Sequence, residues 1–239
     1  PGTLYNSDGV ETRFEVDHAI AGFEGAAGIQ YTDKTLEAFG DEAFITPTDT
    51  ETLGFFLYEA REWESGFGVE GGLRTDNVDY DNIINGKREF DLFSGSIGIH
   101  QHWDNAFFLG GQLSLTERAP NESELFADGP HLATNQFEVG NANFSTESGL
   151  NAEITARYRT DTFSIGVNVF QTEFDDFIYL TPGATIEDGE LVTEADGLPV
   201  FLFAQQDATF TGGEIYSDLI VPRGALGADW TLEASLDFV

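Results

Sequence analysis

The sequence contains no cysteine and no methionine, and only 10 of its 239 residues are lysine or arginine. Without cysteine there is no disulfide framework and no thiolate chemistry, although this absence says little about the compartment. No run of about 18 apolar residues occurs, which excludes a transmembrane helix. It does not exclude a membrane barrel, because a barrel strand needs only about 9–11 residues to cross. The bases form no cluster, so we expect no nucleic-acid partner.

Acidic residues dominate the charge, with 43 Asp and Glu giving a formal net charge of −33. Much of the acid lies in segments without a regular apolar pattern, such as Asp76 to Asp81 and Ile186 to Asp196. Such segments are typical of solvated acidic loops. A second interpretation is a negative funnel that concentrates a cationic solute such as a metal ion. The charge alone does not separate the two.

Several segments alternate strictly between apolar and polar residues. The pattern is clearest in Trp230 to Phe238, and it recurs in Leu150 to Tyr158 and in Phe163 to Val169. Because successive side chains of a strand point to opposite faces, each segment predicts a strand with one apolar and one polar face. Both a soluble β-sandwich and a barrel in a lipid bilayer contain such strands.

The lengths of the connections favour the barrel. About ten strands are predicted, and short turns join them in pairs at Glu24–Gly25, Ser65–Gly66, Asp104–Asn105, Asp161–Thr162 and Pro222–Ala228. Between the pairs lie long links: Leu36 to Glu51, Asn77 to Glu89, Arg118 to Thr146 and Thr181 to Pro199. Outer-membrane barrels have short periplasmic turns and long outer loops, whereas sandwiches distribute loop lengths more evenly. The sequence therefore predicts an all-β protein, an antiparallel transmembrane β-barrel, present as a partial barrel of about ten long strands.

An ordered series of motifs carries a family resemblance. Residues 117–131 read Glu-Arg-Ala-Pro-Asn-Glu-Ser-Glu-Leu-Phe-Ala-Asp-Gly-Pro-His, which resembles the R-A-P-x-x-x-E-L-F-A-x-G-P-H signature of TonB-dependent outer-membrane receptors. Residues 174–180 resemble the family's F-x-D-Y-I-Y-L strand end, and residues 198–214 resemble its LPV…Q-x-D-A…G-x-E run. Upstream, residues 58–61 and 71–76 resemble its E-x-R and G-x-R-x-D strands. The series covers most of residues 52 to 239, and its order makes it more specific than any one motif.

The resemblance implies a barrel in the bacterial outer membrane that imports a scarce nutrient with energy passed on by TonB. Its partners would be outer-membrane lipid, the TonB complex through an N-terminal plug, and a small-molecule or metal ligand. We expect residues 1–239 to be part of the receptor β-barrel domain, without the plug and the final strands. No cofactor is expected to be required.

The cargo is predicted from finer features of the resemblance. The Gly-Pro-His-Leu-Ala-Thr form at residues 129–134 and the LPVF…QQDA form at 198–208 look closest to receptors for zinc and related metals. We therefore expect a divalent metal such as zinc as the transported ligand. The alternative is an iron–siderophore or another organic cofactor. A hypothesis from another class is an acidic β-sandwich that serves binding or adhesion.

Two places in the sequence could hold a metal ion. If Ile97, Ile99 and Trp103 face lipid, His100 and His102 face the lumen, and two imidazoles at i and i+2 can share a zinc or copper ion. Asp104 could add a carboxylate. The second place is the loop that contains Asp128 and His131, although a role in locking the loop is the preferred interpretation there.

Enzymatic activity is not predicted. The sequence has no Gly-x-Ser-x-Gly elbow, no glycine-rich phosphate loop and no His-Glu-x-x-His helix. Arg118, which stands beside Glu117, Glu122 and Glu124, is instead predicted to hold a carboxylate in a bidentate pair.

Overall fold

The computed structural model describes residues 3–40, 43–104, 106–221, 223, 227–228 and 230–239. Its long strands are β1 (Leu4–Ile20), β2 (Phe23–Phe39), β3 (Thr48–Glu62), β4 (Phe67–Asn82), β5 (Gly86–Trp103), β6 (Phe107–Arg118), β9 (Glu147–Arg159), β10 (Phe163–Pro182), β14 (Leu198–Val221) and β15 (Trp230–Phe238). The short elements are α1 (Glu122–Phe126), β7 (Asp128–His131), β8 (Gln136–Val139), β11 (Thr185–Glu187), β12 (Glu190–Val192) and β13 (Glu194–Ala195).

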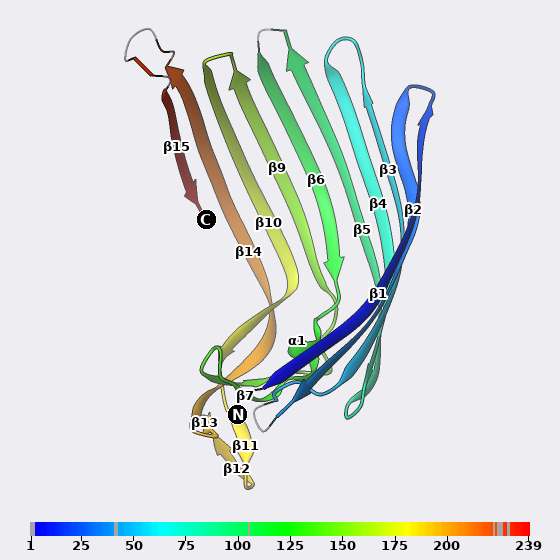
Figure 1. Cartoon of the computed structure of the whole chain (residues 1–239), viewed down its shortest axis with the longest axis vertical. Helices are drawn as coiled ribbons and strands as arrows, with labels where there is room; N and C mark the ends of the chain where they lie inside the picture. The colour runs from blue at the N-terminus through cyan, green and yellow to red at the C-terminus, as the bar shows by residue number, and fades with distance from the viewer. Residues whose placement is uncertain (1–2, 41–42, 105, 222, 224–226, 229) are drawn as a thin grey trace.

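The long strands form one curved sheet in which each strand pairs with the next in the order β1-β2-β3-β4-β5-β6-β9-β10-β14, with β15 beyond β14 (Figure 1). All of these pairs are antiparallel. Within the described residues the sheet stays open: β1 forms one edge, and beyond β14 the other edge is formed by β15 and by β7, which pairs with β14 through β8. The prediction of an antiparallel, partial barrel is confirmed. The β-sandwich hypothesis is wrong, since one sheet curves where a sandwich would need two packed face to face.

Short turns gather at one end of the sheet, and α1, β7 and the β11–β12 hairpin gather at the other (Figure 1). We call these the short-turn end and the long-loop end. The predicted links Arg118 to Thr146 and Thr181 to Pro199 do connect strands at the long-loop end. The predicted turns Asp104–Asn105 and Pro222–Ala228 include residues 105, 222 and 224–226, which lie outside the described residues.

Three predicted connections differ from the structure. The first turn lies at Ala21 and Gly22, which have φ values of 53° and 80°, and not at Glu24–Gly25. Positive φ at both central residues is typical of the tight hairpin turns that match the twist of the strands. The link Asn77 to Glu89 is a hairpin, because β4 and β5 continue pairing as far as Asn82 and Gly86. The link Leu36 to Glu51 is likewise shorter, since β2 ends at Phe39 and β3 begins at Thr48.

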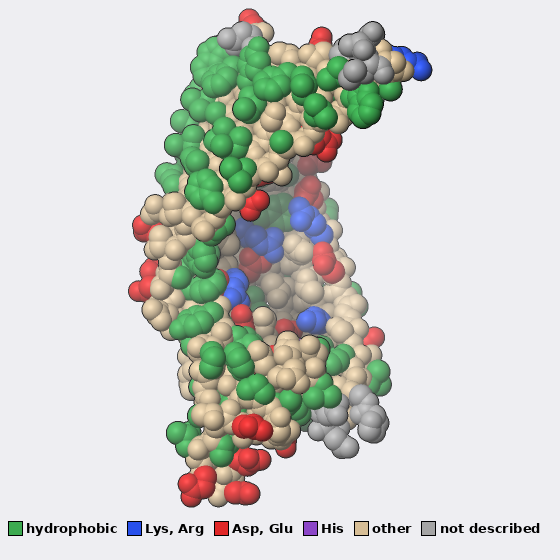
Figure 2. Space-filling model, turned by 90° about the vertical axis from the view of Figure 1, so that its left-hand side faces the viewer, with side chains coloured by type: hydrophobic (Ala, Val, Ile, Leu, Met, Phe, Trp, Pro, Cys, Tyr) green, Lys and Arg blue, Asp and Glu red, His purple; other side chains and the backbone are tan. Residues whose placement is uncertain are grey.

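The two faces of the sheet differ in polarity as the alternation predicts. Ile97, Leu113 and Ile154 project from the convex face and have exposed fractions of 61%, 54% and 57%. The intervening residues line the concave face, and Figure 2 shows Lys, Arg, Asp and Glu side chains gathered in its hollow. Among the described residues, no helix has the length and hydropathy needed to cross a membrane.

The main hydrophobic core lies at the long-loop end, where residues 119–146 fold back over the concave face. The core contains side chains from four elements and from the segment after β8. They are Val78 and Tyr80 of β4, Phe90 and Leu92 of β5, Leu125 and Phe126 of α1, Phe144 after β8, and Ile178 of β10. α1 begins with a capping box, because Asn121 accepts a hydrogen bond from the Glu124 amide and the Glu124 side chain accepts one from the Asn121 amide. This arrangement closes the long-loop end around a packed segment and leaves the short-turn end open.

Candidate functional site

Three potential metal donors lie together on the concave face at the short-turn end. Glu62 is the last residue of β3, and His100 and His102 are near the end of β5. Oε2 of Glu62 lies 3.1 Å from Nε2 of His100 and 3.4 Å from Nδ1 of His102. Among the described residues, this is the one group whose three donor atoms all lie within 4.8 Å of one another.

Glu62 and His100 meet across an intervening strand. The register pairs Glu62 with Gly68 of β4, and Gly68 with His100 of β5. Because Gly68 has no side chain, the imidazole of His100 lies over its backbone. A Cβ atom at Gly68 would come within 2.1 Å of Nε2 of His100. The glycine therefore permits two residues on non-adjacent strands to contact each other directly.

Aromatic and basic side chains support the imidazoles. The ring of Phe108 lies 5.8 Å from that of His100 and 4.9 Å from that of His102, centroid to centroid. The guanidinium of Arg157 lies 4.3 Å from the Phe108 ring, a cation–π distance. Beside His100 opens a cavity of about 280 Å³, whose polar lining includes Gln112 and Glu153. Two nitrogens and a carboxylate oxygen this close together can hold a metal ion or share a proton.

The structure places the predicted site residues at opposite ends of the sheet. Asp104 lies exposed in the turn after β5 and does not belong to the three-donor group. Asp128 and His131 lie on β7 at the long-loop end, where Nδ1 of His131 is 2.8 Å from Oε1 of Glu138. The His131 ring also stacks on Phe44, with the centroids 4.2 Å apart. Glu62, the third donor beside His100 and His102, was missed in the sequence.

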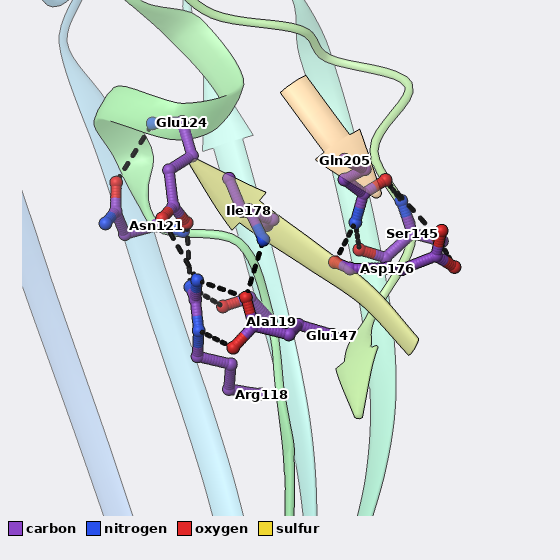
Figure 3. Close-up of polar contacts among 9 residues, drawn as sticks. All are labelled: Arg118, Ala119, Asn121, Glu124, Ser145, Glu147, Asp176, Ile178 and Gln205. Carbon is purple, nitrogen blue, oxygen red and sulfur yellow. Dashed lines mark hydrogen bonds and ion pairs between the residues drawn. The ribbon is translucent and has the colours of Figure 1, made fainter. Parts of the chain in front are cut away.

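A second polar cluster holds the long-loop end together (Figure 3). Arg118, at the end of β6, donates to both oxygens of Glu124 in α1 at 2.8 and 3.1 Å. It also donates to both oxygens of Glu147 in β9 at 2.9 and 2.8 Å. Glu147 accepts a further hydrogen bond from the amide of Ile178 at 2.8 Å. The predicted bidentate pair of Arg118 thus exists twice, and it links α1 to β6, β9 and β10.

Further hydrogen bonds join the segment of residues 119–146 to the sheet. The side chain of Gln205 in β14 donates to the carbonyl oxygens of Ser145 at 2.9 Å and of Asp176 at 3.2 Å (Figure 3). Tyr80 donates to the carbonyl oxygen of Pro120 at 2.9 Å. These residues lie at the long-loop end, past the part of each strand whose convex side carries the exposed apolar side chains. They give the segment a structural role, with no arrangement that suggests a ligand.

Burial changes the acid–base properties of this cluster. Burial raises the pKa of Tyr80 well above its usual value, and Glu122 and Glu124 raise it further. Burial alone would lower the pKa of Arg118, but hydrogen bonds to Glu124 and Glu147 outweigh it and raise that pKa. Tyr80 and Arg118 therefore keep their protons throughout the physiological range.

Comparison with known proteins agrees with this architecture. The model of the family described as "TonB dependent receptor-like, beta-barrel" matches residues 2–239. The solved structure of the copper transporter OprC aligns with a TM-score of 0.77 at 17% identity, covering 99% of this chain and 37% of that one. The siderophore receptor PirA from Pseudomonas aeruginosa aligns with a TM-score of 0.59 at 12% identity, covering 98% and 51%. A mutant ferric enterobactin receptor from the same organism gives 0.65 at 14%, covering 99% and 36%. These identities show a shared fold, and the chain spans only part of each structure's length.

Proposed function

Because the chain belongs to the TonB-dependent receptor β-barrel family, we propose that it forms part of the wall of an outer-membrane receptor that imports a divalent metal such as zinc. The family is found in the bacterial outer membrane, and its members are receptors and transporters rather than enzymes. In this proposal a plug domain, the remaining strands and the contact with TonB belong to the complete receptor. The convex apolar face would contact lipid, and the concave face would line the path of the cargo.

The group of Glu62, His100 and His102 is the observation that carries the metal hypothesis. Imidazole nitrogen and carboxylate oxygen are common zinc ligands, and the three donor atoms already converge. Their side chains lie on the concave face, where a transported ion would pass. Copper is the second ion that this group suits, because imidazole is also a common copper ligand.

Zinc accumulation in cells that express the full-length receptor tests this function. We expect zinc-limited cells to accumulate zinc faster with the receptor than without it, and only when TonB is present. Replacing His100 and His102 together with alanine should reduce uptake to the level of TonB-deficient cells. His18→Ala is the matched control, because His18 projects from the convex face of β1 and should leave uptake unchanged. Zinc uptake that does not depend on TonB or on the receptor would contradict the proposed cargo.

A second candidate cargo is an anionic iron–siderophore. All ten Lys and Arg residues lie within the described part of the chain, and seven of them line the concave face: Arg13, Lys34, Arg74, Arg88, Arg118, Arg157 and Arg159. These bases are the groups that would attract an anionic cargo. Five of the seven, however, already donate to carboxylates or carbonyl oxygens of the protein, as Arg74 does to Asp76 and Arg88 to Phe144. Growth of the same cells on ferric siderophores under iron limitation distinguishes this cargo from zinc.

A further inference from the structure

We propose that Glu62, His100 and His102 form a three-ligand transfer site for a bare divalent transition-metal ion at the short-turn mouth of the barrel. The inference rests on the proposed metal uptake and deepens it. It identifies the ligands, the coordination and the stage of transport at which they act.

The two distances from the Glu62 oxygen fit a tetrahedral ion. With metal–ligand bonds of about 2.0–2.1 Å, neighbouring ligands of a tetrahedral zinc lie about 3.3–3.4 Å apart. The Glu62 oxygen lies 3.1 and 3.4 Å from the two imidazole nitrogens. The two nitrogens lie within 4.8 Å of each other, so an ion can bind all three donors after the side chains adjust. Three protein ligands leave a fourth position open, which water or an incoming donor can fill.

The donor set also selects the ion. Mg²⁺ and Ca²⁺ require about six or more oxygen ligands, and this group supplies one carboxylate. Two imidazoles favour Zn²⁺, Cu²⁺ and Ni²⁺. The site is therefore expected to bind zinc in the presence of the alkaline-earth ions. It also suits a free ion better than a metal still held in a bulky chelate, because the three donor atoms all lie within 4.8 Å of one another.

Gly68 positions the ligands without touching the ion. The residue is buried under the His100 imidazole, and it separates Glu62 from His100 in the row of paired residues. A methyl group at this position would meet the backbone-facing side of the ring, with 2.1 Å to Nε2 and 2.2 Å to Cε1. The ring would have to leave its present position beside Glu62. We therefore expect a single added methyl group to disrupt the site while leaving all three donors in the chain.

The position in the barrel assigns the site to the last stage of uptake. Glu62 ends β3, and Gln101 between the two histidines donates to the carbonyl oxygen of Ser65 in the following turn at 2.7 Å. Short turns of outer-membrane barrels face the periplasm. Capture from outside would occur at the opposite end, so an ion would reach these three ligands as it leaves the lumen.

Calorimetric titration of zinc into the purified full-length receptor in detergent tests the site. We expect the affinity for one zinc ion to fall by about 100-fold or more in Gly68→Ala. This is beyond the upper end of the usual effect of a change outside the ligands themselves. Gly72→Ala is the matched control, because Gly72 lies on the same strand and face and an added Cβ would make only an ordinary 3.4 Å contact with Ser96. Excess Mg²⁺ should not displace the zinc. Cobalt in the same site should give the intense visible bands of a tetrahedral complex.

Unchanged zinc affinity in a folded Gly68→Ala receptor would overturn the inference. If that variant does not fold, Glu62→Gln decides in its place, and wild-type affinity there has the same meaning. Uptake separates this result from the proposed function. Zinc uptake that persists without zinc binding at these residues refutes the transfer site alone. Zinc binding at the site in a receptor that accumulates no zinc refutes the proposed cargo.

Discussion

Arg118→Ala is expected to destabilise the long-loop end by about 3–5 kcal/mol, as loss of one partner of a buried ion pair does. The substitution removes the counter-ion of the Glu124 and Glu147 carboxylates. Water cannot replace it fully, because these side chains are only 9% and 8% exposed. Arg118 itself is 39% exposed, so water can reach the gap and the lower part of this range is favoured. The loss falls on the contacts that join α1 to β6 and β9.

Hydrogen exchange of the full-length receptor measures this effect locally. Amides of residues 119–146 should exchange much faster in Arg118→Ala, while those of β2 to β5 near the short-turn end should not change. Lys87→Ala is the control, since Lys87 pairs with Asp81 at 3.3 Å with both side chains largely exposed. An exposed pair contributes at most about 1 kcal/mol. Equal protection of residues 119–146 in the two variants would show that Arg118 does not hold this segment.

Leu125→Ala is expected to lower the free energy of unfolding by about 2–5 kcal/mol, the usual cost of removing a buried leucine side chain. Leu125 is 2% exposed and belongs to the core between α1 and the concave face of β4 and β5. Its backbone packs closely against Gly140, where an added Cβ would come within 2.8 Å of the Leu125 carbonyl carbon. The substitution is expected to leave a cavity in this core.

Denaturant unfolding of the receptor in detergent, followed by tryptophan fluorescence, gives this difference. Leu132→Ala removes the same side chain from a site that is 53% exposed, and it should change the midpoint little. A similar shift in both variants would mean that the core at the long-loop end contributes no more than its surface. Both substitutions leave the ligands at the short-turn end in place.

The fold was largely predictable because the side-chain alternation of each strand has a fixed period and needs no long-range information. The ends of the strands were less predictable. The sequence predicts a link at residues 77–89, which are rich in acid, yet Val78 and Tyr80 on β4 face the core while Asp79 and Asp81 face out. The alternation continues there with acidic residues on the outer face. The apolar side chains that pack against Val78 and Tyr80 include Leu125 and Phe126 of α1, which lie more than forty residues away in the sequence.

The candidate site was predictable only in part. His100 and His102 could be paired from their spacing, because residues two apart on a strand share a face. Glu62 could not be added, since its distance from His100 depends on the register of two hairpins. The signal exists in the sequence: with the turn at Ser65–Gly66 in place, Glu62 and Gly68 become partners. A glycine on the strand between an acid and a histidine then indicates that the two can meet.

The pairing partners of β14 have a consequence for the order in which the chain folds. In the main sheet, each long strand pairs with the next long strand in the chain. Only short elements separate β6 from β9 and β10 from β14 in the sequence. β8 is different, because it pairs in parallel with β14 through Phe137 and Val200, residues far apart along the chain. Closing so long a loop costs more conformational entropy than closing a hairpin, and contacts of this kind form slowly. The hairpins can therefore assemble one after another, and the pairing of β8 with β14 forms only when β14 has arrived.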